Sequence, residues 1–226
     1  MRINMNKSET ILGWCYLVFQ TLILPLVLTI GNLYLPTPFT EGELNILLFA
    51  VNFLAVWGIF HKFLWRSLKV ALRNPLGCLK AAAWGFAVYY LGNLIVSYLI
   101  YFLSPGFFNV NDQTIAGMAQ SNYTLVALGV VVLVPVTEEI FYRGLIFGKL
   151  YNRSKWAAYV VSTLVFSLLH VTGYIGMYDP KTLILCFLQY LPPSIGLAFA
   201  YAKSDTIWTS VLIHTTVNVL GILSMR

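Results

Sequence analysis

The sequence predicts an all-α fold, a polytopic transmembrane helix bundle of about seven spans that forms a single integral membrane domain over residues 1–226. Of the 226 residues, 59% are hydrophobic and 10% are charged, whereas an ordinary soluble domain has about 25% charged residues. The apolar residues gather into stretches close to the ~20 residues that a helix needs to cross a bilayer. Too few charges remain to coat a water-facing surface of this size, which excludes a soluble fold and a nucleic-acid partner.

Seven expected spans follow one another with short connections. They cover residues 11–31, 44–64, 82–102, 124–148, 156–176, 182–202 and 206–225. Each proline inside them removes a backbone donor and is expected to bend its helix; these are Pro25, Pro135, Pro192 and Pro193. We expect Asn52, Asn93 and Gln189 to be ordinary interhelical hydrogen-bond partners. The three cysteines show no CxxC spacing, which predicts neither a disulfide framework nor a thiolate zinc site.

Lysine and arginine are distributed unequally between the loops, and this predicts the orientation in the membrane. One side carries eleven of them: Arg2, Lys7, Lys62, Arg66, Lys69, Arg73, Lys80, Lys149, Arg153, Lys155 and Lys203. The other side carries Lys181 and Arg226. The N-terminus is therefore expected in the cytoplasm and the C-terminus outside. Apolar and basic residues alternate over 63–72, which fits either an amphipathic segment on the inner leaflet or an ordinary basic loop.

Ionisable residues inside the expected spans are the informative exceptions, because a charge near the bilayer centre costs roughly 2.5–3.5 kcal/mol. Five of them stand out: Glu138, Glu139, Arg143, His170 and His214. Glu139 and Arg143 are four residues apart, so they share one helix face and form an intrahelical ion pair. Glu138 points about 100° away from Glu139. It is therefore free to face a cavity, where it is suited to act as a general base.

Two further helix faces pair a histidine with a neighbour four residues away. Phe166 and His170 lie on one face of their span, and His214 and Asn218 repeat the spacing in the last span. At about 1.5 Å per residue, Glu138 lies roughly 16 Å from the cytoplasmic end, His170 about 21 Å and His214 about 12 Å. Three spans thus bring these groups to similar depth, and we expect one site. Taken singly, each motif also fits a structural hydrogen bond or ion-pair cluster.

Together these residues resemble the three motifs of the CPBP family, the CAAX proteases and bacteriocin-processing enzymes that are also called the Abi family of intramembrane proteases. The motifs are Glu138-Glu139-Ile-Phe-Tyr-Arg143, Phe166-Ser-Leu-Leu-His170 and His214-Thr-Thr-Val-Asn218. Their order and their placement on separate spans fit the family. The resemblance covers roughly residues 124–225, which are therefore expected to form a catalytic core.

The resemblance implies a membrane-embedded peptidase that cuts a peptide or a lipidated protein. We expect the peptidase to be a multi-pass protein of a bacterial cell membrane. Glu138 with His170 would activate a water for attack on a peptide carbonyl. His214 and Asn218 would donate hydrogen bonds to the oxyanion of the tetrahedral intermediate. The supporting residues would be Glu139, Arg143 and Phe166.

Two questions stay open at this point, namely the cofactor and the function class. The resemblance to the CAAX-processing branch favours a metal-free glutamate mechanism, and the alternative is a zinc site with Glu138, His170 and His214 as ligands. A non-catalytic membrane partner, acting in bacteriocin self-immunity or on a sensor kinase, would keep the fold but tolerate loss of Glu138. An ion-coupled transporter would use the Glu and His groups as a relay, but the inverted repeats expected of one are not evident.

Overall fold

The computed structural model describes residues 4–225, and every long regular element in this range is a helix. Seven helical stretches in the range are long and apolar enough to cross a membrane: Lys7–Leu33, Glu41–Arg73, Pro75–Leu103, Val110–Tyr151, Lys155–Thr172, Pro180–Ser204 and Ile207–Ser224. The predicted all-α bundle is therefore confirmed, and the chain is a multi-pass integral membrane protein. Arg2 and Arg226, both used in the charge count, lie outside the described residues.

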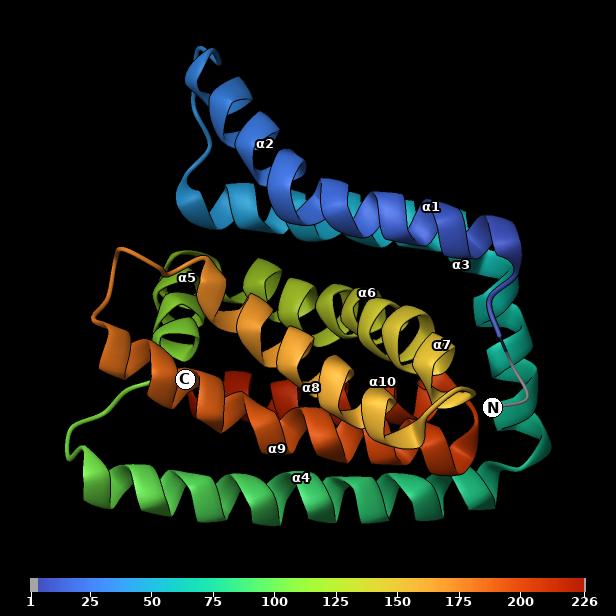
Figure 1. Ribbon diagram of the computed structural model, residues 1–226. Coiled ribbons are helices and arrows are strands. Elements are labelled where there is room, and N and C mark those ends of the chain that lie inside the picture. Colours follow the sequence, from blue (N-terminus) through green and yellow to red (C-terminus); the bar gives the residue numbers. More distant parts are fainter. Residues whose placement is uncertain (1–3, 226) are drawn as a thin grey trace.

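The helices form three layers (Figure 1). One outer layer holds α1 (Lys7–Val18), α2 (Leu24–Leu33) and α3 (Glu41–Arg73), and the opposite outer layer is α4 (Pro75–Leu103), which packs on α9 (Pro180–Ser204). Between them lie α5 (Val110–Leu128), α6 (Val134–Glu139), α7 (Gly148–Tyr151), α8 (Lys155–Thr172) and α10 (Ile207–Ser224). The start of α1 and the end of α10 lie at opposite ends of the bundle. Which end faces the cytoplasm stays a prediction from the basic residues.

The fourth span begins earlier than the apolar pattern predicts. It covers Val110–Tyr151 rather than 124–148, because Asn109 caps a helix whose first turns are polar and escape a hydropathy criterion. The Asn109 side chain accepts the backbone N–H groups of Asn111 and Asp112, as an N-cap residue does. The helix bends at Asn122, whose backbone leaves the helical region at φ −153° and ψ 81°.

Two of the four prolines bend their helices by widening the turn before them. The π-helical turns η1 (Phe19–Ile23) and η2 (Gly129–Leu133) end just before Pro25 and Pro135, which occupy the first turns of α2 and α6. Proline has no N–H to donate and its ring crowds the preceding turn, and a wider turn relieves this crowding. A third π-helical stretch, η3 (Ile140–Phe147), has no proline to explain it.

Residues 63–72 are neither a separate segment nor a loop, because α3 continues without a break to Arg73 and only Asn74 separates it from α4. Phe63 and Leu64 are buried and Trp65 is exposed, so this part of α3 belongs to the bundle. It is fixed to the start of α10 by Ser67, whose hydroxyl lies 2.9 Å from that of Thr206.

The outer helix α4 approaches α9 closely at two glycines. A Cβ on Gly85 would lie 2.7 Å from the Ala200 Cβ, and one on Gly196 would lie 2.6 Å from the Gly85 carbonyl oxygen. Small residues let helix backbones pack tightly in a bilayer, where apolar burial alone gives little driving force. This contact fixes the position of α9, which carries two residues of the site described next.

Candidate active site

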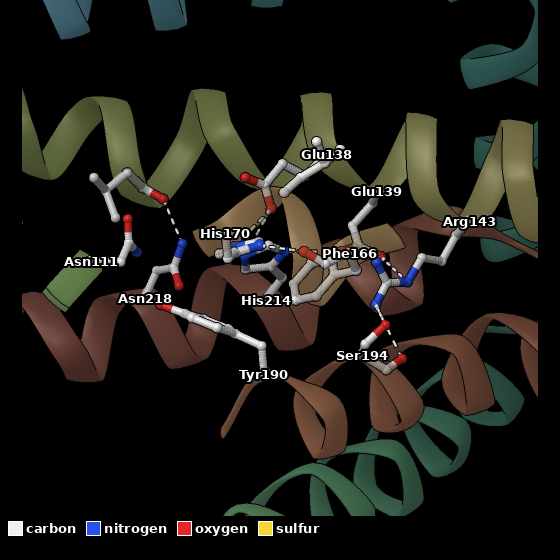
Figure 2. Close-up of polar contacts among 12 residues, drawn as sticks. Asn111, Glu138, Glu139, Arg143, Phe166, His170, Tyr190, Ser194, His214 and Asn218 are labelled. Carbon is white, nitrogen blue, oxygen red and sulfur yellow. Dashed lines mark hydrogen bonds and ion pairs between the residues drawn. The ribbon is translucent and has the colours of Figure 1, made fainter. Parts of the chain in front are cut away.

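Glu138 lies at the meeting point of three helices (Figure 2). Its Oε2 lies 3.8 Å from His170 Nε2 on α8 and 4.0 Å from His214 Nε2 on α10. The side chain of Glu138 is 24% exposed, against 14% for His170 and 9% for His214. Both distances exceed a direct hydrogen bond, and one bridging water would satisfy this spacing. Within the described residues, Glu138 Oε2 is buried and has no hydrogen-bond partner.

Glu139 and Arg143 form the ion pair that their spacing predicts. Arg143 Nε lies 3.2 Å from Glu139 Oε2, and both side chains are fully buried. The guanidinium also donates from Nη2 to the carbonyl and the hydroxyl oxygen of Ser194 at 3.1 and 3.3 Å, and it lies 4.7 Å from the Phe166 ring centroid. Ser194 was not anticipated, because a serine inside an apolar helix is common and gives no signal of its own.

The hydrogen bonds of the two histidines define how their rings are oriented. His214 Nδ1 lies 2.9 Å from Glu139 Oε1, and His170 Nδ1 lies 2.8 Å from the Phe166 carbonyl oxygen. A carboxylate and a carbonyl can only accept, so Nδ1 is the donor in both rings. Each ring therefore directs its other nitrogen, Nε2, toward Glu138 (Figure 2).

Asn218 lies at one edge of this group. Its Nδ2 donates to the Val130 carbonyl oxygen at 2.7 Å, which uses one of its two hydrogens. Figure 2 shows Asn218 beside Asn111 and Tyr190, one turn of α10 beyond His214. The structure thus brings Glu138 and the two histidines together and places Asn218 next to them.

Phe166 and Tyr190 both contact the His170 ring, with centroid distances of 4.3 Å each. Phe166 was expected from its spacing to His170. Tyr190 was not, because it lies on α9 and only the packing of α9 against α8 brings it to the site.

A cavity of about 110 Å³ reaches Glu138 from the side of η1 and α3. Its lining residues come from η1, α3 and the segment around α6: Gln20, Leu48, Phe49, Asn52, Val134, Thr137, Glu138, Phe141 and Tyr142. This volume is below the range of pockets for drug-sized ligands, roughly 300–1,000 Å³. It accommodates a compact group such as one side chain.

The zinc alternative has observations on both sides. In residues 4–225, no group of three or more His, Cys, Asp and Glu side chains is arranged to hold a metal ion. Both imidazoles nevertheless donate from Nδ1, to Glu139 and to the Phe166 carbonyl, and direct Nε2 at the same oxygen of Glu138, as metal-binding histidines do. We derive no chemical step through zinc, and the metal-free mechanism stays a prediction.

Fold and site together define a class, a multi-pass membrane protein with a carboxylate and two imidazoles facing one another between its helices. Residues 120–220 match a family model described as type II CAAX prenyl endopeptidase Rce1-like. This segment, which holds all three motifs, is therefore similar to the CPBP family. This relationship supports a membrane peptidase of the CAAX-protease type.

Individual relatives come from two bacteria. The chain is 26% identical over 180 residues to the putative membrane peptidase YdiL of Bacillus subtilis, and this match covers 76% of the chain and 69% of YdiL. It is 26% identical over 188 residues to the UPF0177 protein YbdI of Lactococcus lactis, and this match covers 79% of the chain and 90% of YbdI. A 90-residue match to YxdF of L. lactis is 31% identical and spans only 44% of that protein. No solved structure matches the chain significantly.

Proposed function

We propose that the protein is an intramembrane endopeptidase in which Glu138 activates a water molecule for attack on a peptide bond. The observation that carries this proposal is the position of Glu138 Oε2, a buried oxygen without a hydrogen-bond partner in the described structure and within 4.0 Å of two imidazole Nε2 atoms. A water held there can give one proton to the carboxylate while His170 Nε2 accepts a hydrogen bond from its other O–H.

In the proposed reaction, the water oxygen bonds to the carbonyl carbon and one water proton passes to Glu138. The carbonyl oxygen takes the negative charge. Hydrogen bonds from the second Nδ2 hydrogen of Asn218, and from His214 Nε2 when that atom carries a proton, stabilise this oxyanion. When the carbon–nitrogen bond breaks, Glu138 returns its proton to the leaving amine, and the remaining water proton is lost from the new carboxylic acid.

The second carboxylate has a different task. Glu139 accepts from His214 Nδ1 and pairs with Arg143 at complete burial, so it holds the imidazole in one orientation and is shielded from substrate. Of the two adjacent carboxylates, the partly exposed Glu138 is therefore the one that acts on water.

The substrate is a peptide, or a lipidated protein, that reaches Glu138 through the bilayer or from the cytoplasmic face. The cavity between η1, α3 and α6 supports access from the side of the N-terminal helices. Its small volume fits one amino-acid side chain next to the bond to be cut.

The test is cleavage of quenched-fluorescent peptide libraries, prenylated and unmodified, by the purified protein in lipid bilayers. Wild type is expected to cut a subset of peptides, and Glu138→Ala and His170→Ala to cut none. Glu41→Gln is the matched control, because Glu41 is exposed in the first turn of α3. The proposal fails if the wild-type protein cuts nothing while cells that carry Glu138→Ala behave like wild-type cells and not like cells that lack the protein. Such a result would favour the non-catalytic partner.

A further inference from the structure

Tyr190 contacts the face of His170 although none of the three motifs includes it. The two ring centroids are 4.3 Å apart and the ring planes are inclined by 35°. Phe166 makes a similar contact, at 4.3 Å and 36°, and the Phe166 and Tyr190 rings are 6.4 Å apart. The His170 ring therefore belongs to a three-ring cluster whose spacings are typical of favourable aromatic contacts.

The Tyr190 ring is held at its far end by a hydrogen bond to Asn109. The Tyr190 hydroxyl lies 3.1 Å from Asn109 Oδ1. The same oxygen accepts the backbone N–H groups of Asn111 and Asp112 at 3.0 and 3.3 Å. Because a backbone N–H can only donate, this atom must be the amide oxygen and the Tyr190 hydroxyl must be the donor.

The nitrogen of Asn109 is fixed as well. Asn109 Nδ2 donates to Gln189 Oε1 at 2.9 Å, and Gln189 Nε2 donates to Ser97 Oγ on α4 at 3.3 Å. One end of the network is thus the helix cap of α5, and the other is anchored on α4. Tyr190 cannot turn its ring without losing its hydrogen bond to Asn109. Asn109 is only 9% exposed, so water compensates little for the loss of this bond.

We propose that Tyr190, held by Asn109, is a positioning residue that fixes the plane of the His170 ring and keeps Nε2 directed at Glu138. This inference rests on the proposed function, because it gives His170 a task that depends on orientation. The hydrogen bond from His170 Nδ1 to the Phe166 carbonyl leaves the ring free to tilt about that bond, and the Tyr190 contact removes this freedom.

The main variants separate the ring of Tyr190 from its hydroxyl. Tyr190→Leu removes both, and we expect kcat to fall about 10- to 100-fold with KM changed less than about twofold, since a misplacement near 1 Å can cost about 100-fold. Tyr190→Phe keeps the ring and loses only its hydrogen bond to Asn109, so its kcat is expected to lie between that of Tyr190→Leu and that of wild type. Asn109→Ala removes the same hydrogen bond, and its kcat should resemble that of Tyr190→Phe. Asn74→Ala is the matched control for Asn109→Ala, because Asn74 caps α4 and does not belong to the network.

A second readout does not depend on catalysis. Diethyl pyrocarbonate modifies neutral imidazoles, and its rate at each histidine can be followed by peptide mass mapping. We expect Tyr190→Leu to raise the modification rate at His170 several-fold, and the rate in Tyr190→Phe to lie between those of Tyr190→Leu and wild type. The exposed His61 serves as the internal reference in every sample, and its rate should not change.

The outcomes are distinct. If Tyr190→Leu keeps the wild-type kcat per folded molecule and the wild-type His170 modification rate, Tyr190 only stabilises the bundle and the proposal is overturned. If the wild-type protein cleaves no peptide, the proposed function fails, and the modification rates alone still decide whether Tyr190 positions the His170 ring.

Discussion

Replacing Arg143 with methionine tests whether the buried ion pair holds the site together. Arg143 and Glu139 are both fully buried and their nearest atoms are 3.2 Å apart. The variant leaves the Glu139 carboxylate inside the bundle without its cation, and breaking a buried pair in this way typically costs about 3–5 kcal/mol. The hydrogen bonds from the guanidinium to Ser194 are lost as well. We expect the free energy of unfolding to fall by at least about 3 kcal/mol.

The measurement is unfolding in mixed micelles by increasing SDS, followed by tryptophan fluorescence. Lys62→Met is the control, because Lys62 is exposed on α3 and its loss should change stability by less than about 0.5 kcal/mol. In the double variant Glu139→Leu/Arg143→Met, the free energy of unfolding should fall by less than the sum of the falls in the two single variants, because neither charge is left unpaired. The double variant still leaves His214 Nδ1 unpaired, at a cost of about 1–3 kcal/mol. If Arg143→Met unfolds at the same SDS concentration as the wild-type protein, this reasoning is refuted.

Three shorter predictions follow from the same structure. Cleavage should be unaffected by EDTA, and a loss of activity that added zinc restores would contradict the metal-free mechanism. Asn218→Ala should lower kcat about 10²- to 10³-fold at nearly constant KM, as measured by steady-state cleavage, because a donor to the oxyanion is removed; an unchanged kcat would take Asn218 out of the mechanism. In a cysteine-free background, a membrane-impermeant maleimide should label Lys62→Cys only from the cytoplasmic side and Lys181→Cys only from outside, and the reverse pattern would invert the predicted orientation.

The sequence predicts the centre of the site well, for a physical reason. Charged and imidazole side chains are costly inside a bilayer, so Glu138, His170 and His214 stand out against an apolar background. Helix spacing then predicts the Glu139–Arg143 pair, and the rise per residue predicts that the three groups meet. The distances of 3.8 and 4.0 Å around Glu138 agree with that expectation.

The remaining partners depend on packing between helices, which a single sequence does not reveal. Ser194 and Tyr190 are ordinary residues of an apolar helix, and they reach the site only because α9 lies against α8 and α4. The start of α5 is polar, so a search for apolar stretches places it in a loop. Gln189 was expected to be a simple interhelical contact, and it is one, but its partner Asn109 also holds Tyr190.

The central claim is that Glu138 activates the water, and the most direct test is the steady-state kcat of Glu138→Gln on one peptide identified from the libraries. The variant keeps the size of the side chain and removes its ability to take a proton, so the account predicts a fall of about 10²- to 10⁴-fold, with unfolding in SDS close to wild type. Activity of Glu138→Gln within tenfold of wild type would contradict it.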